Sequence, residues 1–141
     1  MKICKDVMTT EPVCCFPNES VEIAAQLMKL EDVGCIPVVD NEENYKLVGI
    51  LTDRDLAMEI VAAGRDASRV KVEEIMKNEP FACKDSDQLD KAIDGMANHQ
   101  VRRIPIVDDD NRVVGIIAQG DVATRLHDPE TTGQIVEKIS Q

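Results

Sequence analysis

The sequence predicts a mixed α/β (α+β) protein made of two copies of one β-α-β-β-α unit. The chain has 141 residues, and its 43% apolar share is enough for a hydrophobic core and too high for disorder. An internal repeat divides the chain into halves, and each half alternates short apolar runs with an amphipathic stretch, as strands and helices do. A sheet of three strands is too small to be stable alone, so we expect two units that share a core.

The repeat is found by aligning Met8 with Met76, a shift of 68 residues. Segment 8–40 then matches segment 76–108 with identical residues at 11 of 33 positions, where unrelated segments would share roughly two. Removing two residues from the first turn also aligns Asp55 with Asp121. We expect the first repeat at residues 1–66, the second at 67–127 and a helical tail at 128–141.

The elements of the first repeat follow from its hydrophobic periodicity. A short strand at Val13–Cys15 precedes a helix with Ser20 as its N-cap. The run Ile36–Val39 is apolar throughout, which predicts a strand covered on both faces, and its proline indicates a strand start or an edge. A turn at 40–44, a strand at Leu47–Leu51 and a helix that opens near Asp53 complete the unit. The apolar face of the first helix comprises Val21, Ala24, Ala25, Leu27 and Met28.

The second repeat has the same order of elements. Strands are predicted at Phe81–Cys83, Ile104–Val107 and Val113–Ala118, with a turn at 108–111 and a helix from Gln119. Between the repeats, Gly64 ends one helix and another runs through 70–76. The apolar face of the long helix comprises Leu89, Ala92, Ile93 and Met96.

Composition argues against several classes of function. A net charge of −11 and an aromatic content of 2% disfavour nucleic-acid binding. No apolar run approaches the roughly 20 residues of a membrane span, and the charged N-terminus does not resemble a secretory signal, so we expect no membrane contact and a cytoplasmic location.

Five cysteines without Cys-x-x-Cys spacing do not indicate a disulfide scaffold or a zinc site. They are typical of small buried hydrophobes in a reducing cytoplasm. The alternative is a redox or metal role for Cys14 and Cys15, although adjacent strand residues point to opposite faces.

The segment Gly49–Asp55 is the main candidate site. It places the Thr52 hydroxyl and the Asp55 carboxylate three residues apart where a strand enters a helix. A hydroxyl there can donate to a phosphate, which the N-terminus of a helix favours, and a carboxylate can accept from both ribose hydroxyls. The same spacing also resembles a capping box, in which Thr52 and Asp55 would serve the helix alone.

The order of three segments, Asp6-Val7-Met8-Thr9, Ile36–Asp40 and Gly49–Asp55, with its partial recurrence in the second half, resembles a tandem pair of CBS domains. These regulatory repeats are named after cystathionine β-synthase, and a pair is called a Bateman module. The resemblance implies two repeats packed sheet to sheet about a pseudo-twofold axis, with two clefts between them. It further implies homodimers and a ligand such as AMP, ADP or ATP, or S-adenosylmethionine.

The resemblance also implies roles for single residues. Thr52 would contact phosphate and Asp55 the ribose. The second copy keeps Asp121 but has Ala118 in place of the hydroxyl, so we expect unequal clefts with the Thr52 cleft preferred. Arg102 and Arg103 would face ligand phosphates. The preferred cleft would be completed by Ile50, Phe81, Ala82, Val101 and Ile104 around the adenine, with Lys77 nearby.

The expected function is therefore a non-enzymatic sensor that requires no cofactor, binds an adenine nucleotide and signals to an unknown effector protein. One alternative is a structural interaction or dimerisation module without nucleotide. Others are a sensor of S-adenosylmethionine or of an NAD(H)-type ligand, and an enzyme or redox protein that uses the cysteines.

Overall fold

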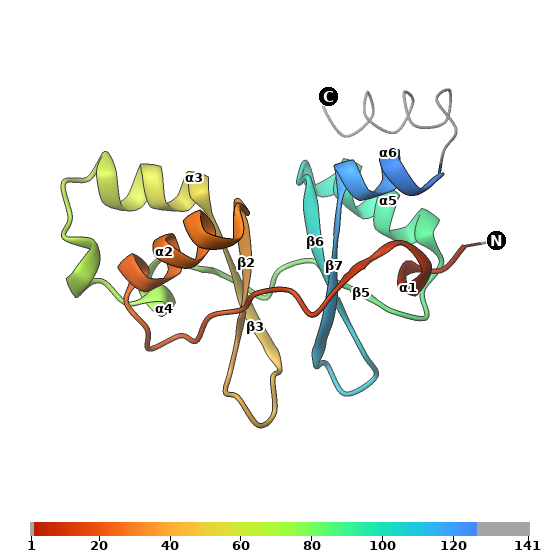
Figure 1. Ribbon diagram of the computed structural model, residues 1–141, viewed down its shortest axis with the longest axis horizontal. Coiled ribbons are helices and arrows are strands. Elements are labelled where there is room, and N and C mark those ends of the chain that lie inside the picture. Colours follow the sequence, from red (N-terminus) through yellow and green to blue (C-terminus); the bar gives the residue numbers. More distant parts are fainter. Residues whose placement is uncertain (1, 127–141) are drawn as a thin grey trace. The chain divides into compact units, whose positions relative to one another are not determined.

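The computed structural model describes residues 2–126, which form two compact units interleaved along the chain (Figure 1). The central unit is the continuous stretch Pro12–Pro80. The split unit joins the first eleven positions to the part of the chain that begins at Phe81. The mixed α/β class predicted from the sequence is confirmed, whereas the expected tail at 128–141 lies outside the described residues.

The central unit contains one antiparallel sheet in the order β2-β3-β4. The helix α2 precedes β2, and a second helical stretch follows β3. Its elements are α2 (Val21–Glu31), β2 (Cys35–Val39), β3 (Leu47–Thr52), α3 (Asp53–Leu56), the π-helix η1 (Ala57–Val61), the 3-10 helix η2 (Ala67–Arg69), α4 (Val72–Ile75) and β4 (Lys77–Asn78).

The split unit contains a four-stranded sheet in the order β1-β7-β6-β5, in which only β5 and β6 run parallel. Its long helix, α5, connects β5 to β6. Its elements are α1 (Cys4–Val7), β1 (Thr9–Thr10), β5 (Cys83–Lys84), α5 (Leu89–His99), β6 (Arg103–Val107), β7 (Val113–Ala118) and α6 (Gln119–Leu126).

The helices and hairpins form where the hydrophobic pattern predicts them. Ser20 caps α2, since its hydroxyl oxygen accepts a hydrogen bond from the Ile23 N–H at 3.3 Å. Gly64 ends the first helical stretch with a φ of 67°, a left-handed conformation that glycine adopts without strain. All four predicted core residues of α5 are buried, as are Val21, Ala24 and Met28 of α2. Each unit therefore has its own apolar core.

Two predicted strands are shorter than expected. In the segment Val13–Cys15 only Cys15 pairs, through a single parallel bridge to Val38. In the second repeat the strand begins at Cys83 rather than Phe81 and pairs in parallel with Ile106 and Val107. In both repeats the cysteine is thus the first residue to reach the sheet edge, and the residues before it still belong to the segment that enters the unit.

The leading segments of the two repeats are exchanged. The repeat alignment makes β1 equivalent to β4, yet β1 pairs with β7 of the split unit and β4 pairs with β3 of the central unit. The chain passes between units at Glu11–Pro12 and again at Pro80–Phe81, and Glu11 and Glu79, beside these crossings, have left-handed φ angles of 50° and 48°. The expected repeat boundaries describe the sequence, whereas the chain changes from one compact unit to the other after residues 11 and 80.

Two equivalent glycines let the exchanged strands approach closely. A Cβ on Gly49 would lie 2.6 Å from the Met76 sulfur and 2.9 Å from the Lys77 carbonyl oxygen. A Cβ on Gly115 would lie 2.5 Å from the Met8 sulfur and 2.9 Å from the Thr9 carbonyl oxygen. Real Cβ atoms do not tolerate these separations, so glycine is required wherever a leading segment crosses a sheet.

Within residues 2–126 there is no helix of the length and apolarity that crossing a membrane requires.

Candidate functional site

Thr52 and Asp55 form a complete capping box where β3 becomes α3. The Thr52 hydroxyl oxygen accepts a hydrogen bond from the Asp55 N–H at 3.1 Å. In return, Oδ2 of Asp55 accepts a hydrogen bond from the Thr52 N–H at 3.0 Å. Thr52 and Asp55 therefore form both hydrogen bonds that define a capping box.

Capping leaves part of each side chain available. The Thr52 hydroxyl acts only as an acceptor in the cap, so its proton can still be donated. Among the described residues no hydrogen bond reaches Oδ1 of Asp55, which can accept from a ligand. Both side chains are half-buried and both are held in place by the cap. The cap thus holds one free donor and one free acceptor in place at the end of β3.

The central unit brings two more candidate residues near this motif. Ile50 precedes Thr52 by two residues on β3, and Lys77 is its cross-strand partner on β4. The Asp53 N–H donates to the Gly34 carbonyl oxygen at 2.9 Å, which ties the start of α3 to the chain just before β2. Of the predicted site residues, Ile50, Thr52, Asp55 and Lys77 therefore belong to one unit.

The equivalent motif of the split unit has the same backbone geometry with different side chains. Oδ2 of Asp121 accepts a hydrogen bond from the Ala118 N–H at 3.0 Å. The Thr9 hydroxyl of β1 donates to the Asp121 carboxylate and lies 3.4 Å from each of its oxygens. Thr9 occupies the repeat position of Lys77, but its hydroxyl proton is donated to Asp121, so it does not replace the free donor missing at Ala118. Sequence reasoning overlooked Thr9, although the repeat alignment pairs it with Lys77.

Two arginines lie beside the Asp121 motif. Arg103 is the cross-strand partner of Ala118, and the Arg102 carbonyl oxygen accepts a hydrogen bond from the Gln119 N–H at 2.8 Å. Both side chains are exposed, and neither forms an ion pair with any residue between 2 and 126. Their charges remain available to an anion. The structure thus places these arginines in the unit of Asp121 rather than in that of Thr52.

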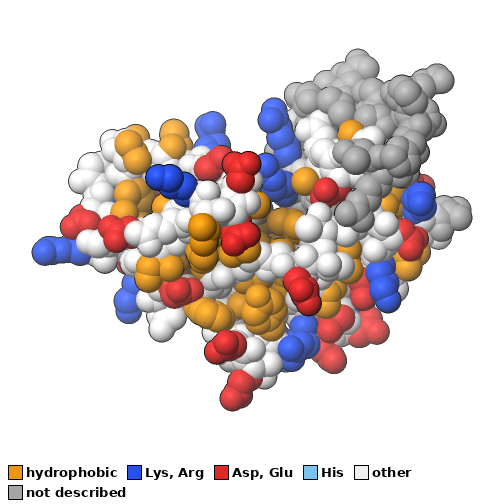
Figure 2. All heavy atoms as spheres, in the orientation of Figure 1, with side chains coloured by type: hydrophobic (Ala, Val, Ile, Leu, Met, Phe, Trp, Pro, Cys, Tyr) orange, Lys and Arg blue, Asp and Glu red, His pale blue; other side chains and the backbone are white. Residues whose placement is uncertain are grey.

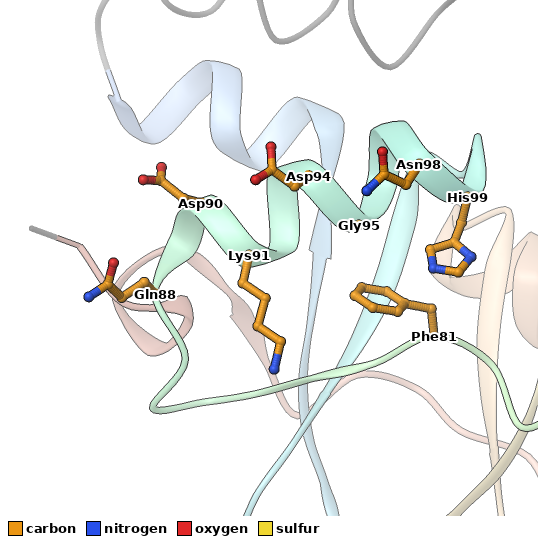
Figure 3. A pocket seen from close by; sticks show the side chains of 8 residues that line it. All are labelled: Phe81, Gln88, Asp90, Lys91, Asp94, Gly95, Asn98 and His99. Carbon is orange, nitrogen blue, oxygen red and sulfur yellow. The ribbon is translucent and has the colours of Figure 1, made fainter.

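The remaining predicted residues also lie in the split unit. Ile104 is 1% exposed in the core, and Val101 packs against the same core. The Phe81 ring stacks on His99 with ring centroids 4.6 Å apart and lies against Gly95 (Figure 3). Phe81, Gly95 and His99 border a pocket of about 440 Å³ along α5, and the other residues that line it are polar. A single cleft that combines both sets of predicted residues stays a prediction.

Cys14 and Cys15 do not have the environment of reactive thiols. Burial raises the pKa of Cys15 to about 12, and burial also raises the pKa of the Cys14 thiol. Among residues 2–126, no three His, Cys, Asp or Glu side chains gather in a way that could hold a metal ion.

The geometry defines a class of protein: an α/β module of two repeats, each with a carboxylate-bearing capping motif at the end of its hairpin. A family model described as the CBS domain matches residues 4–62 and 72–128. The CBS domain-containing protein YhcV of Bacillus subtilis is 43% identical over 140 residues, which cover 99% of this chain and 96% of the relative. The chain belongs to the CBS domain family and consists of two such domains in tandem.

Solved structures of CBS pairs are similar to this one. A CBS domain pair in complex with 5′-methylthioadenosine and S-adenosyl-L-methionine has a TM-score of 0.77 and 28% identity, and the match covers 87% of this chain and 94% of that one. CBSX2 in complex with AMP has a TM-score of 0.74 and 26% identity, and the match covers 96% and 99%. Both neighbours bind a ligand that contains adenosine.

Proposed function

We propose that this protein is a regulatory module that binds an adenosine-containing ligand at the Thr52–Asp55 motif and passes the signal to a partner protein. The observation that carries the proposal is the capping box that keeps a hydroxyl proton and a carboxylate oxygen unused. A vicinal diol and a phosphate are the groups that such a carboxylate and such a hydroxyl recognise. The adenosyl ligands of the two similar structures support the same class of ligand.

Each candidate residue has a role in this proposal. Oδ1 of Asp55 accepts from the ribose hydroxyls, and the Thr52 hydroxyl donates to a phosphate. Lys77, Arg102 and Arg103 supply positive charge to the phosphates. The adenine would lie among the apolar residues Ile50, Phe81, Ala82, Val101 and Ile104.

Charge favours AMP, ADP or ATP over S-adenosylmethionine. The protein has a net charge of −11, so a nucleotide phosphate must find local cations, and both arginines lack ion-pair partners among the described residues. S-adenosylmethionine carries a positive sulfonium centre, which those cations would repel. We therefore expect the nucleotide to bind more tightly.

The Asp121 motif is proposed as a second position for the same class of ligand. It combines the Asp121 carboxylate, the Thr9 hydroxyl and the neighbouring Arg103. Because the Thr9 hydroxyl donates to Asp121, the expectation of a weaker second cleft based on Ala118 stays a prediction, with Arg103 as the neighbouring cation.

The proposal is tested by thermal unfolding with AMP, ADP, ATP, S-adenosylmethionine and NADH, followed by calorimetric titration. A ligand at 100 times its Kd stabilises the protein by about 2.7 kcal/mol. The informative variant is Asp55→Asn, because the amide oxygen can still accept from the Thr52 N–H while an NH₂ group replaces the free acceptor. We expect its unliganded stability to stay near that of the wild type and its nucleotide affinity to fall at least tenfold.

The companion variant is Asp121→Asn, which makes the same change in the second proposed position. Binding that survives both substitutions would remove the site assignment. If no adenosyl ligand shifts the unfolding temperature, the fully formed cap favours the alternative, a structural interaction module in which Thr52 and Asp55 serve only α3.

A further inference from the structure

The two motifs differ in the hydrogen bonds that their carboxylates already accept. In both, Oδ2 of the aspartate accepts from the backbone N–H three residues earlier. Among the described residues no hydrogen bond reaches Oδ1 of Asp55, whereas both oxygens of Asp121 lie 3.4 Å from the Thr9 hydroxyl that donates to them. The Asp121 carboxylate therefore already accepts from a hydroxyl, which is the group that a ribose would present to it.

Strand pairing brings Thr9 to this carboxylate. Thr9 is the cross-strand partner of Ile116, and Ile116 precedes Ala118 by two residues on β7, so the three side chains share one face of the sheet. The close approach of β1 depends on Gly115, because a Cβ there would lie 2.9 Å from the Thr9 carbonyl oxygen. The helix α6 begins directly after Ala118 and carries Asp121 in its first turn.

The central unit provides an internal comparison. Lys77 occupies the repeat position of Thr9, and among the described residues it forms no ion pair with Asp55. The hydroxyl of the central motif belongs to Thr52, where it accepts from the Asp55 N–H and makes no bond to the carboxylate. The residue at the position shared by Thr9 and Lys77 therefore decides whether the carboxylate is occupied before a ligand arrives.

We propose that Thr9 is a positioning residue that keeps the Asp121 carboxylate occupied, so that a ligand at the second motif must displace the Thr9 hydroxyl. This inference rests on the proposed binding of adenosine-containing ligands. The ligand group that competes with Thr9 is the ribose diol, since its hydroxyls donate to the same oxygens. Thr9 thus favours the Thr52–Asp55 motif over the second one.

The size of the effect follows from the kind of hydrogen bond. The ribose and Thr9 compete for the same acceptors, so each weakens the binding of the other by the same factor. The Thr9 bond is long and Thr9 is exposed, so that factor is modest. We expect removal of the Thr9 hydroxyl to tighten ligand binding at the second motif about fivefold, as the loss of one competing hydrogen bond would do.

The first test isolates the second motif with an Asp55→Asn background. AMP, ADP and ATP are each titrated calorimetrically into this variant alone, with Thr9→Val added and with Thr10→Val added. Valine keeps the shape and strand preference of threonine, and Thr10 makes no side-chain hydrogen bond within residues 2–126. We expect Thr9→Val to lower the Kd about fivefold and Thr10→Val to leave it unchanged. Damage to the fold would weaken binding, so a purely structural role of Thr9 cannot produce this gain.

The second test transfers the hydroxyl to the central unit, with Asp121→Asn as the background. Lys77→Thr and Lys77→Val both remove the cation and both introduce a β-branched residue, so they differ only in the hydroxyl. We expect the threonine variant to bind the nucleotides about fivefold more weakly than the valine variant, because its hydroxyl can donate to Asp55.

Equal affinities for Thr9→Val and Thr10→Val, or for the two Lys77 variants, would overturn the role of Thr9 and leave the proposed function standing. A wild type that binds none of the three nucleotides would overturn both.

Discussion

At the scale of single residues, the two repeats differ in the sizes of the residues on the entering segment and on the long helix. Phe81 lies against Gly95 in the split unit, and a Cβ on Gly95 would come within 2.1 Å of the Phe81 ring. The repeat alignment puts Val13 and Leu27 at these positions in the central unit. In the split unit a large residue on the entering segment thus lies against a helix position without a side chain, whereas the sequence of the central unit has a smaller residue and a larger one at these positions.

We expect Gly95→Ala to have opposite effects on stability in wild type and in a Phe81→Val background. Gly95→Ala improves helix propensity by about 1 kcal/mol, but in wild type it must displace the Phe81 ring from its stack on His99. Overpacking costs about 1–3 kcal/mol, so we expect net destabilisation of about 1 kcal/mol. In a Phe81→Val background the same substitution should be stabilising. Urea unfolding of the four proteins measures the coupling, and equal effects in both backgrounds would contradict this packing argument.

The residue scale also shows what a motif can and cannot predict. The Thr52–Asp55 spacing predicted both hydrogen bonds of a capping box, because those bonds are local to four consecutive residues. The same reasoning could not place Thr9 beside Asp121, since they are far apart in sequence and meet only through β1. It likewise could not show that strand pairing puts Arg103 opposite Ala118, and the role of Arg103 at the Thr52 motif stays a prediction.

At the scale of elements, the exchanged strands β1 and β4 depend on close contact across a glycine. Gly49→Ala would force its Cβ into the Met76 side chain and the Lys77 carbonyl oxygen, and the second of these is backbone that cannot rotate away. We expect a loss of about 1–3 kcal/mol in the free energy of unfolding, together with faster hydrogen exchange in β4.

Gly64→Ala is a useful control for Gly49→Ala, because it tests backbone conformation without crowding. No atom lies within 4 Å of its added Cβ, but its φ of 67° disfavours any side chain. We expect Gly64→Ala to lower the free energy of unfolding and to leave the rate of hydrogen exchange in β4 unchanged. If Gly49→Ala also left β4 protected, close packing would not be what holds the strand.

Hydrophobic pattern predicted the long elements well and the short ones poorly. The helices α2 and α5 and the hairpin strands each have enough alternating or periodic residues to reveal their type. The strands β1 and β4 have two residues each, so they carry no periodic signal. The pairing of these two strands depends on which sheet edge the chain reaches after a turn, and the local sequence does not determine which edge that is.

At the scale of the whole molecule, the two units differ in what their helices expose. Leu30 at the end of α2 is 77% exposed, and Met58 and Val61 of η1 are 55% and 78% exposed. Figure 2 shows hydrophobic side chains on the part of the central unit that carries these helical segments. The position equivalent to Leu30 in α5 is the polar residue Asn98. A second copy of the chain is the occupant we propose for this apolar face.

The asymmetry gives a paired test of self-association. Leu30→Glu places a charge on the apolar face, and Asn98→Glu places the same charge at the equivalent polar position. We expect the first variant to raise the dimer dissociation constant at least tenfold and the second to leave it near wild type. Sedimentation equilibrium measures both, and identical behaviour of the two variants would refute association through this face.

The interleaved connection of the two units also has a consequence for biosynthesis. Everything the central unit requires has left the ribosome once residue 80 has emerged, so it can fold while translation continues. The first eleven residues must wait with their strand unpaired until the hairpin near the end of the chain is made. The nascent chain therefore passes through a stage in which the central unit is folded and β1 of the split unit is still unpaired.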